Sequence, residues 1–153
     1  MYYYQKETRY TTGYGLGSSR ADEKPAYCFG HGLSYTRFEY SDLKMDTLVT
    51  TGQDINISFR VKNTGEREGK EVPMLFIGDE VSSITTPIAM LKGFDKISLQ
   101  PGEEKTVTFT VPYKHLGLWN ADMKYVVEPG LFSVKIGRSY QDIRLKGVFS
   151  VVS

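Results

Sequence analysis

The sequence has few of the residues from which metal and redox sites are built. Its 153 residues include one cysteine, two histidines and one tryptophan. A single cysteine excludes an internal disulfide framework, and a zinc site needs three or four protein ligands. Cys28 and His31 are near neighbours, but the second histidine, His115, lies far along the chain. We therefore expect no metal site and no bound cofactor.

The chain also lacks an excess of charge of either sign and lacks a long apolar run. It has 19 basic and 18 acidic residues, a net charge of +1. Binding to nucleic acid or to an anionic membrane needs a basic face, and crossing a bilayer needs about 18 or more consecutive apolar residues. The N-terminal MYYYQKETRY has no apolar region of a signal peptide. We expect no nucleic-acid or membrane partner, and the compartment is left open.

Catalytic groups are equally sparse. A Cys28–His31 nucleophile pair is unlike known catalytic pairs, whose members come together from distant parts of a fold. Sugar hydrolysis uses two carboxyl groups about 5–10 Å apart, and two pairs of adjacent acids occur, Asp79–Glu80 and Glu103–Glu104. Neighbours along a strand or turn usually point apart, so we read both pairs as solvated loop residues. We expect no catalytic residue, and the chain alone is not an enzyme.

What the sequence does have, from about Phe38 onward, is a series of short alternating segments. In DINISFRVKNTG, over 54–65, every second residue is apolar and Asn63-Thr64-Gly65 is a turn signal. The same alternation recurs in 103–112, 131–137 and 143–152. Seven or eight strands at roughly ten-residue spacing predict an all-β sandwich.

Two segments carry additional signals. EVPMLFIG, over 71–78, is apolar throughout and predicts a strand covered on both faces, with Pro73 marking either its start or a sheet edge. PYKHLGLWN, over 112–120, has room for one short helical turn. A helix of three turns is not indicated anywhere in the chain.

The first 35 residues differ from the rest. They hold seven of the eleven tyrosines and show no helical or strand periodicity. Disordered segments are poor in aromatic residues, so the tyrosines favour an arm that lies along another surface. We therefore divide the chain into an irregular arm or interdomain linker over 1–35 and a β-sandwich over 36–153.

The segment FGHGLSYTRFEYSDL, over 29–43, resembles the start of the C-terminal fibronectin type III-like domain of glycoside hydrolase family 3 enzymes, the β-glucosidases and β-xylosidases. The resemblance continues through VKNTGEREGKEV at 61–72, through 91–111 and through 126–139. It implies a fibronectin type III or immunoglobulin-like sandwich at the end of a retaining β-glycosidase. The nucleophile and the acid/base of such an enzyme lie in upstream domains, so no catalytic residue is carried onto this sequence.

The resemblance also suggests a role for the glycine-rich start of the domain. Glycines let the backbone turn where side chains would clash, and the aromatic residues between them offer flat apolar faces. We predict that this strip is an interface with the upstream catalytic domains of the same polypeptide, which the sandwich stabilises or positions. The predicted interface residues are Tyr27, Phe29, His31, Tyr35 and Phe38.

Two alternatives remain open from the sequence. Trp119 could stack on a sugar ring, which would make the chain a module that holds a β-linked glycan near the active site. A single tryptophan in a sandwich is more often packed in the core or in an interface. The chain could also be a free-standing protein-interaction module.

Overall fold

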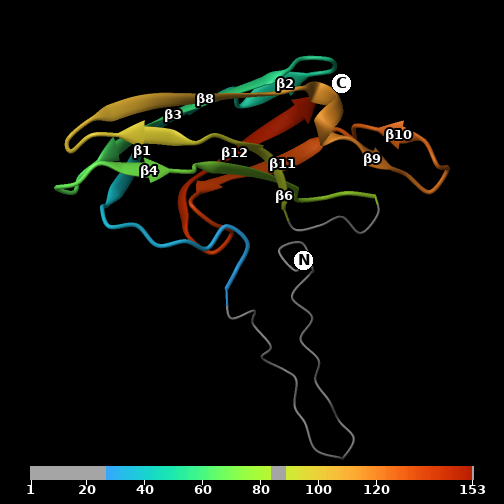
Figure 1. Ribbon diagram of the computed structural model, residues 1–153. Helices are drawn as coiled ribbons and strands as arrows, with labels where there is room; N and C mark the ends of the chain where they lie inside the picture. Colours follow the sequence, from blue (N-terminus) through green and yellow to red (C-terminus); the bar gives the residue numbers. More distant parts are fainter. Residues whose placement is uncertain (1–26, 84–88, 153) are drawn as a thin grey trace, which may run out of the picture.

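In a computed structural model, the described residues, 27–83 and 89–152, form a sandwich of two sheets whose strands are antiparallel except for one pair (Figure 1). One sheet has three strands, in the order β1 (Phe38–Met45), β3 (Ile55–Asn63), β8 (Glu104–Val111). The other has five, in the order β2 (Leu48–Thr50), β12 (Ile143–Val152), β11 (Gly130–Gly137), β5 (Met74–Asp79), β6 (Met90–Phe94). Within it, β2 pairs with β12 in parallel.

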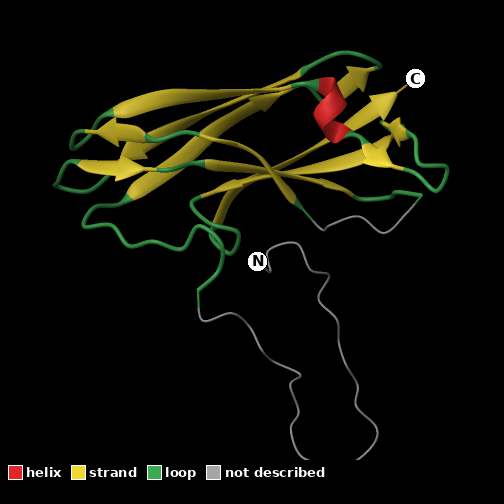
Figure 2. Cartoon of the chain, turned by 45° about the vertical axis from the view of Figure 1, so that its right-hand side comes forward, coloured by secondary structure: helices red, strands yellow, loops and turns green. Residues whose placement is uncertain are grey.

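Two short strand pairs complete the fold. They are β4 (Gly69–Glu71) with β7 (Ile97–Leu99), and β9 (Leu118–Trp119) with β10 (Tyr125–Val126). A 3₁₀ helix, η1 (Tyr113–Leu116), precedes β9 (Figure 2) and confirms the predicted helical turn. In the described part of the chain, seven strands have five or more residues. The all-β sandwich predicted from the sequence is therefore confirmed.

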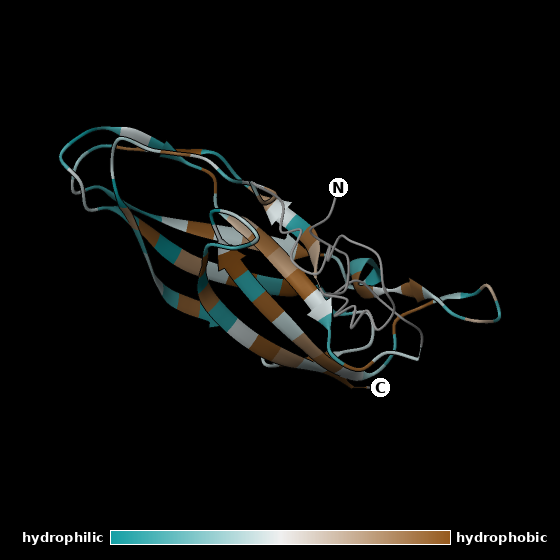
Figure 3. Cartoon of the chain, turned by 90° about the horizontal axis from the view of Figure 1, so that it is seen from below, coloured by the Kyte–Doolittle hydropathy of each residue, from teal (hydrophilic) through white to brown (hydrophobic). Residues whose placement is uncertain are grey.

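The core lies between the two sheets and follows the alternation of the sequence. In β3 every second residue is buried, and Figure 3 shows the same alternation as bands of colour along the strands. On the facing sheet, the rings of Phe132 and Phe149 stack in the core with their centroids 5.2 Å apart. Burial of each large apolar side chain stabilises the fold by roughly 1.5–3 kcal/mol.

Strand β5 is buried on both faces, as its apolar sequence predicts. Leu75 and Ile77 face the core, whereas Phe76 points to the outer side and is still fully buried. The rings of Phe29 and Tyr140 cover it edge-on, at centroid distances of 6.5 Å and 5.8 Å. Strand β5 begins directly after Pro73 and lies between β11 and β6, so the proline marks a strand start and not a sheet edge.

Candidate functional site

Residues 27–37 form no strand and run beneath the five-stranded sheet (Figures 1 and 2). They are attached to the loop that follows β11. The backbone N–H of Tyr140 donates to the carbonyl oxygen of Phe29 at 3.0 Å, and the Cys28 thiol lies 3.5 Å from the Ser139 hydroxyl. The first described residues are therefore docked on the sandwich. Residues 1–26, the rest of the predicted arm, lie outside the described residues.

Gly30 makes this docking possible. Its φ is +83°, and a Cβ at this position would lie 2.9 Å from the Met74 side chain and 3.0 Å from the Cα of Ser139. Only glycine adopts such a backbone conformation without strain and leaves room for so close an approach.

The five predicted interface residues have different environments. Tyr27 and Tyr35 are 74% and 95% exposed, and His31 is exposed with its ring centroid 4.8 Å from that of Tyr27. Phe29 is half-buried against Phe76.

Phe38 requires a correction, because it is 5% exposed and belongs to the hydrophobic core. It opens β1, and its side chain is buried in phase with Tyr40 two residues on, so it packs inside the domain. The sequence analysis also missed Leu33, which is 94% exposed between these aromatic residues.

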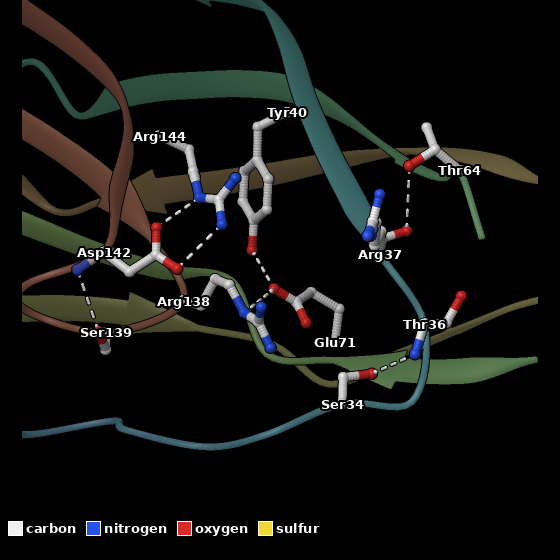
Figure 4. Close-up of polar contacts among 10 residues, drawn as sticks. All are labelled: Ser34, Thr36, Arg37, Tyr40, Thr64, Glu71, Arg138, Ser139, Asp142 and Arg144. Carbon is white, nitrogen blue, oxygen red and sulfur yellow. Dashed lines mark hydrogen bonds and ion pairs between the residues drawn. The ribbon is translucent and has the colours of Figure 1, made fainter. Parts of the chain in front are cut away.

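A buried polar cluster fixes the loop to which this segment is attached (Figure 4). Oε1 of Glu71 accepts a 2.9 Å hydrogen bond from the Tyr40 hydroxyl and lies 3.2 Å from Nε of Arg138. Glu71 is 3% exposed, and its burial raises the pKa of its carboxyl group. Burial and the nearby Glu71 likewise raise the pKa of Tyr40. With so little exposure, Glu71 is inaccessible to a dissolved substrate, and its role is to hold strands together.

The same loop has a second, more exposed ion pair. The carboxylate of Asp142 accepts two hydrogen bonds from the Arg144 guanidinium, which lower the pKa of Asp142. The carbonyl oxygen of Asp142 also accepts a hydrogen bond from the backbone N–H of Arg138, at 3.1 Å. The loop over 138–142 therefore has a defined conformation before anything docks against it.

Asn63 fixes the other end of the segment. It is fully buried, and its Oδ1 accepts hydrogen bonds from the Thr36 hydroxyl at 2.7 Å and from the Gly65 N–H at 3.0 Å. Its Nδ2 donates to the carbonyl oxygens of Arg67 and Leu99. The four contacts come from three parts of the chain, namely residue 36, the turn at 65–67 and residue 99, so one asparagine joins them. The predicted turn after β3 is thereby confirmed and explained.

The outer faces of the two sheets differ in polarity. The outer face of the five-stranded sheet has four exposed apolar side chains, together with Ser133, Ser150 and the charged Arg144 and Lys146 of β12. The four apolar side chains are Leu48, Phe94, Leu131 and Val148. The three-stranded sheet instead exposes threonines and charged residues, among them Arg60, which pairs with Glu104. Exposed apolar patches of this kind mark contact sites, so the side of the molecule that includes 27–35 is the candidate interface.

Trp119 lies at the far end of the sandwich, on β9, and is 59% exposed. The alternative in which Trp119 is packed in the core is therefore wrong. A nearby cavity lined by Asp79, Lys92 and Leu116 has a volume of about 20 Å³, room for about one water molecule. Any sugar at this end of the domain would therefore bind on the surface.

Across 27–83 and 89–152, His, Cys, Asp and Glu side chains do not gather in a group that could hold a metal ion. In that part of the chain, no helix is long and apolar enough to cross a membrane.

The sequence is similar to a known domain family and to known enzymes. Residues 71–140 match the fibronectin type III-like domain family. The chain is 46% identical over 142 residues to the thermostable beta-glucosidase B of Acetivibrio thermocellus, covering 90% of this chain and 19% of that protein. It is 41% identical over 138 residues to a beta-xylosidase of Formosa agariphila, with coverages of 89% and 19%.

A solved structure of a beta-glucosidase also matches the fold of this chain. The fold superimposes on a beta-glucosidase from Listeria innocua in complex with glucose with a TM-score of 0.89 and 32% identity, covering 100% of this chain and 22% of that one. The chain thus spans about a fifth of the length of these relatives.

The fold and the matched residues define a fibronectin type III-like β-sandwich domain. The chain belongs to the fibronectin type III-like domains of glycoside hydrolase family 3 β-glucosidases and β-xylosidases, as its sequence resemblance predicted.

Proposed function

We propose that this domain is the non-catalytic accessory domain of a retaining β-glycosidase, and that it packs against the upstream catalytic domains through 27–35 and the outer face of the five-stranded sheet. The observation that carries the proposal is the exposure of Tyr27, Leu33 and Tyr35 on a segment that the sandwich itself holds in place. Side chains so exposed are costly to leave in water unless another surface covers them.

The relatives support the same role. Each is a longer glycosidase in which the part that matches this chain is about a fifth of the protein. A fixed apolar segment on such a domain stabilises the assembly because the entropy of ordering it is lost when the domain folds and not on docking.

The test uses the longer polypeptide that carries this sequence and compares three proteins. They are the unchanged enzyme, a Tyr27→Ser/Leu33→Ser/Tyr35→Ser variant, and a Thr106→Ser/Thr108→Ser/Thr110→Ser control on the polar face. We expect the first variant to lower the melting temperature of the whole enzyme by several degrees and to reduce the yield of active protein. The control should have neither effect.

The same six substitutions are then made in the 153-residue chain alone. There the apolar triple variant should unfold as the unchanged chain does, since its side chains contact solvent. A reading frame that does not extend upstream into a glycosidase would refute the proposal. So would a full-length triple variant with unchanged stability and activity.

A further inference from the structure

The hairpin formed by β9 and β10 presents two aromatic rings to solvent. Trp119 and Tyr125 are direct cross-strand partners, so their side chains share one face of the hairpin. Their ring centroids are 5.5 Å apart with an interplanar angle of 61°, and they are 59% and 48% exposed. Together they form a raised aromatic surface, which we call the β9–β10 platform, defined by Trp119 and Tyr125.

The platform is held rigidly from below. The Tyr125 hydroxyl donates to the carbonyl oxygen of Lys114 at 2.8 Å. The Tyr125 ring also rests on Gly117, where a Cβ would lie 2.5 Å from ring atom Cε1. A residue larger than glycine at 117 would therefore displace the ring. Since Trp119 packs on that ring, its orientation depends on the same anchor.

The turn of the hairpin is equally ordered. Oδ1 of Asn120 accepts hydrogen bonds from the backbone N–H groups of Asp122 and Lys124, at 3.0 Å and 2.9 Å. The backbone N–H of Asn120 donates to the carbonyl oxygen of Lys124 at 3.0 Å. A ligand that stacks on the platform thus finds both rings in place, and little conformational entropy remains to be lost on binding.

The size and charge of the platform decide what it fits. Two half-exposed rings offer on the order of 200 Å² of apolar surface, whereas one side of a stable protein–protein interface buries about 800 Å². The hairpin and the 3₁₀ helix before it also carry exposed Lys114, Asp122 and Lys124, whose charges have both signs. This combination suits a small neutral ligand with one flat apolar face and a rim of hydroxyl groups.

We infer that the β9–β10 platform is a binding surface for a pyranose ring of a β-linked gluco- or xylo-oligosaccharide. Such a ring presents C–H groups on its face and equatorial hydroxyls at its edge. The C–H face stacks on the Trp119 ring, and the Tyr125 ring, inclined at 61° to it, borders the sugar on one side. The choice of β-linked gluco- and xylo-sugars rests on the proposed function; the stacking site itself rests on the geometry of the hairpin.

Because Trp119 is the one tryptophan of the chain, its fluorescence reports on the platform directly. The 153-residue chain is titrated with cellohexaose, laminarihexaose and xylohexaose up to ~50 mM, since a single stacking site is expected to bind with millimolar affinity. We expect a saturable change in Trp119 emission with at least one of them. No change with any of the three would overturn the inference.

Variants separate stacking from an indirect effect. Mobility in native gels containing soluble β-glucan or xylan gives a readout that does not require the tryptophan. Trp119→Ala should weaken retardation at least tenfold, and Gly117→Ala should weaken it by displacing the Tyr125 ring. Phe94→Ala, which removes an exposed aromatic residue from another strand, should leave retardation unchanged. Equal retardation of Trp119→Ala and the unchanged chain would refute the site.

This experiment and the test of the proposed function fail independently. The interface triple variant at 27, 33 and 35 should still bind oligosaccharide, because its substitutions lie in the segment beneath the sheet and not in the hairpin. Conversely, a blue-shifted and sugar-insensitive Trp119 emission in the longer polypeptide would mean that a neighbouring domain covers the platform. That result would overturn the inference and leave the accessory role in place.

Discussion

The backbone N–H of Tyr140 donates to the carbonyl oxygen of Phe29, and the rings of both residues cover the outward-pointing Phe76. Phe29 comes before the first strand and Tyr140 comes just before the last, so their contact exists only in the folded domain. The segment that includes Phe29 is therefore held on the surface of the folded sandwich. Its attachments can be tested by substitution, because the chain offers matched control positions for several of them.

Gly30→Ala should release the docked segment, and Gly52→Ala is its control. Both glycines have a φ near +83°, but a Cβ at Gly52 meets nothing within 4 Å, whereas at Gly30 it meets Met74 and Ser139. Each substitution should cost about 1 kcal/mol for the backbone conformation. Only Gly30→Ala should also speed hydrogen exchange of the Tyr140 amide, by about tenfold or more. Equal exchange rates in the two variants would show that the segment is not held there.

Glu71→Ala should destabilise the domain by about 2–4 kcal/mol, since it leaves the Tyr40 hydroxyl and the Arg138 guanidinium without their acceptor. Glu104→Ala is the control, because Glu104 pairs with Arg60 at the surface, where ion pairs contribute about 1 kcal/mol or less. Urea unfolding of both variants measures the difference. A loss for Glu71→Ala no greater than that for Glu104→Ala would show that the buried cluster does not hold the strands.

The pH dependence of stability should show the opposite sign from that of a simple ion pair. Burial raises the pKa of Glu71 above its ordinary value of 4.5, so the folded domain binds this proton more tightly than the unfolded chain does. The contribution of Glu71 is then fully present below about pH 4.5 and is lost as the pH rises through the pKa of the folded state.

Glu71→Gln isolates this contribution, because Gln cannot titrate and can still accept both hydrogen bonds. The free energy of unfolding of the unchanged chain minus that of Glu71→Gln should decrease as the pH is raised from 4 to 7. The pKa of Asp142 is lowered by Arg144, and its effect has the reverse sign but cancels in the difference. A difference that grows with pH would mean that attraction to Arg138 outweighs burial.

Asn63→Ala should cost about 3–5 kcal/mol, because four polar groups lose their partner and two of the lost hydrogen bonds are fully buried. Asn56→Ala, on the same strand, is the control. Asn56 is exposed and makes one side-chain hydrogen bond, to Thr110, so its replacement should cost no more than about 1 kcal/mol. The melting temperatures of the two variants give the comparison. Similar melting temperatures for both variants would show that Asn63 does not hold the segment before β1 to the turn after β3.

The sandwich itself could be predicted because its signals are local. The alternation in β3 and the apolar run of β5 each identify a strand from neighbouring residues. Pro73 indicated either a strand start or a sheet edge, and the structure shows the start. Strands of two or three residues, such as β9, are too short to show a period. They form because a partner strand comes to lie beside them.

The site could be predicted less well, because it depends on contacts between distant residues. The glycine and aromatic spacing of 27–35 indicated an interface, but it could not show that Phe38 turns inward with β1 while Leu33 remains exposed. The sequence did not indicate that Glu71 pairs with Tyr40 and Arg138, or that Asn63 bonds to Leu99. These partners are far apart in sequence and meet only in the folded domain. The position of Glu71, an acidic residue at the start of an apolar run, was the one sequence signal that it could be buried.

The parallel pairing of β2 with β12 bears on how the domain is synthesised. Strand β2 is synthesised before β3 to β11, yet its hydrogen-bonding partner is β12 (Ile143–Val152), which also separates β2 from β11. On the ribosome, the five-stranded sheet therefore cannot close until residues 143–152 have left the exit tunnel. Until then Phe132 on β11 lacks Phe149, its stacking partner. A polypeptide that ends before residue 143 should thus expose an open sheet edge and an apolar interior, and such chains tend to aggregate.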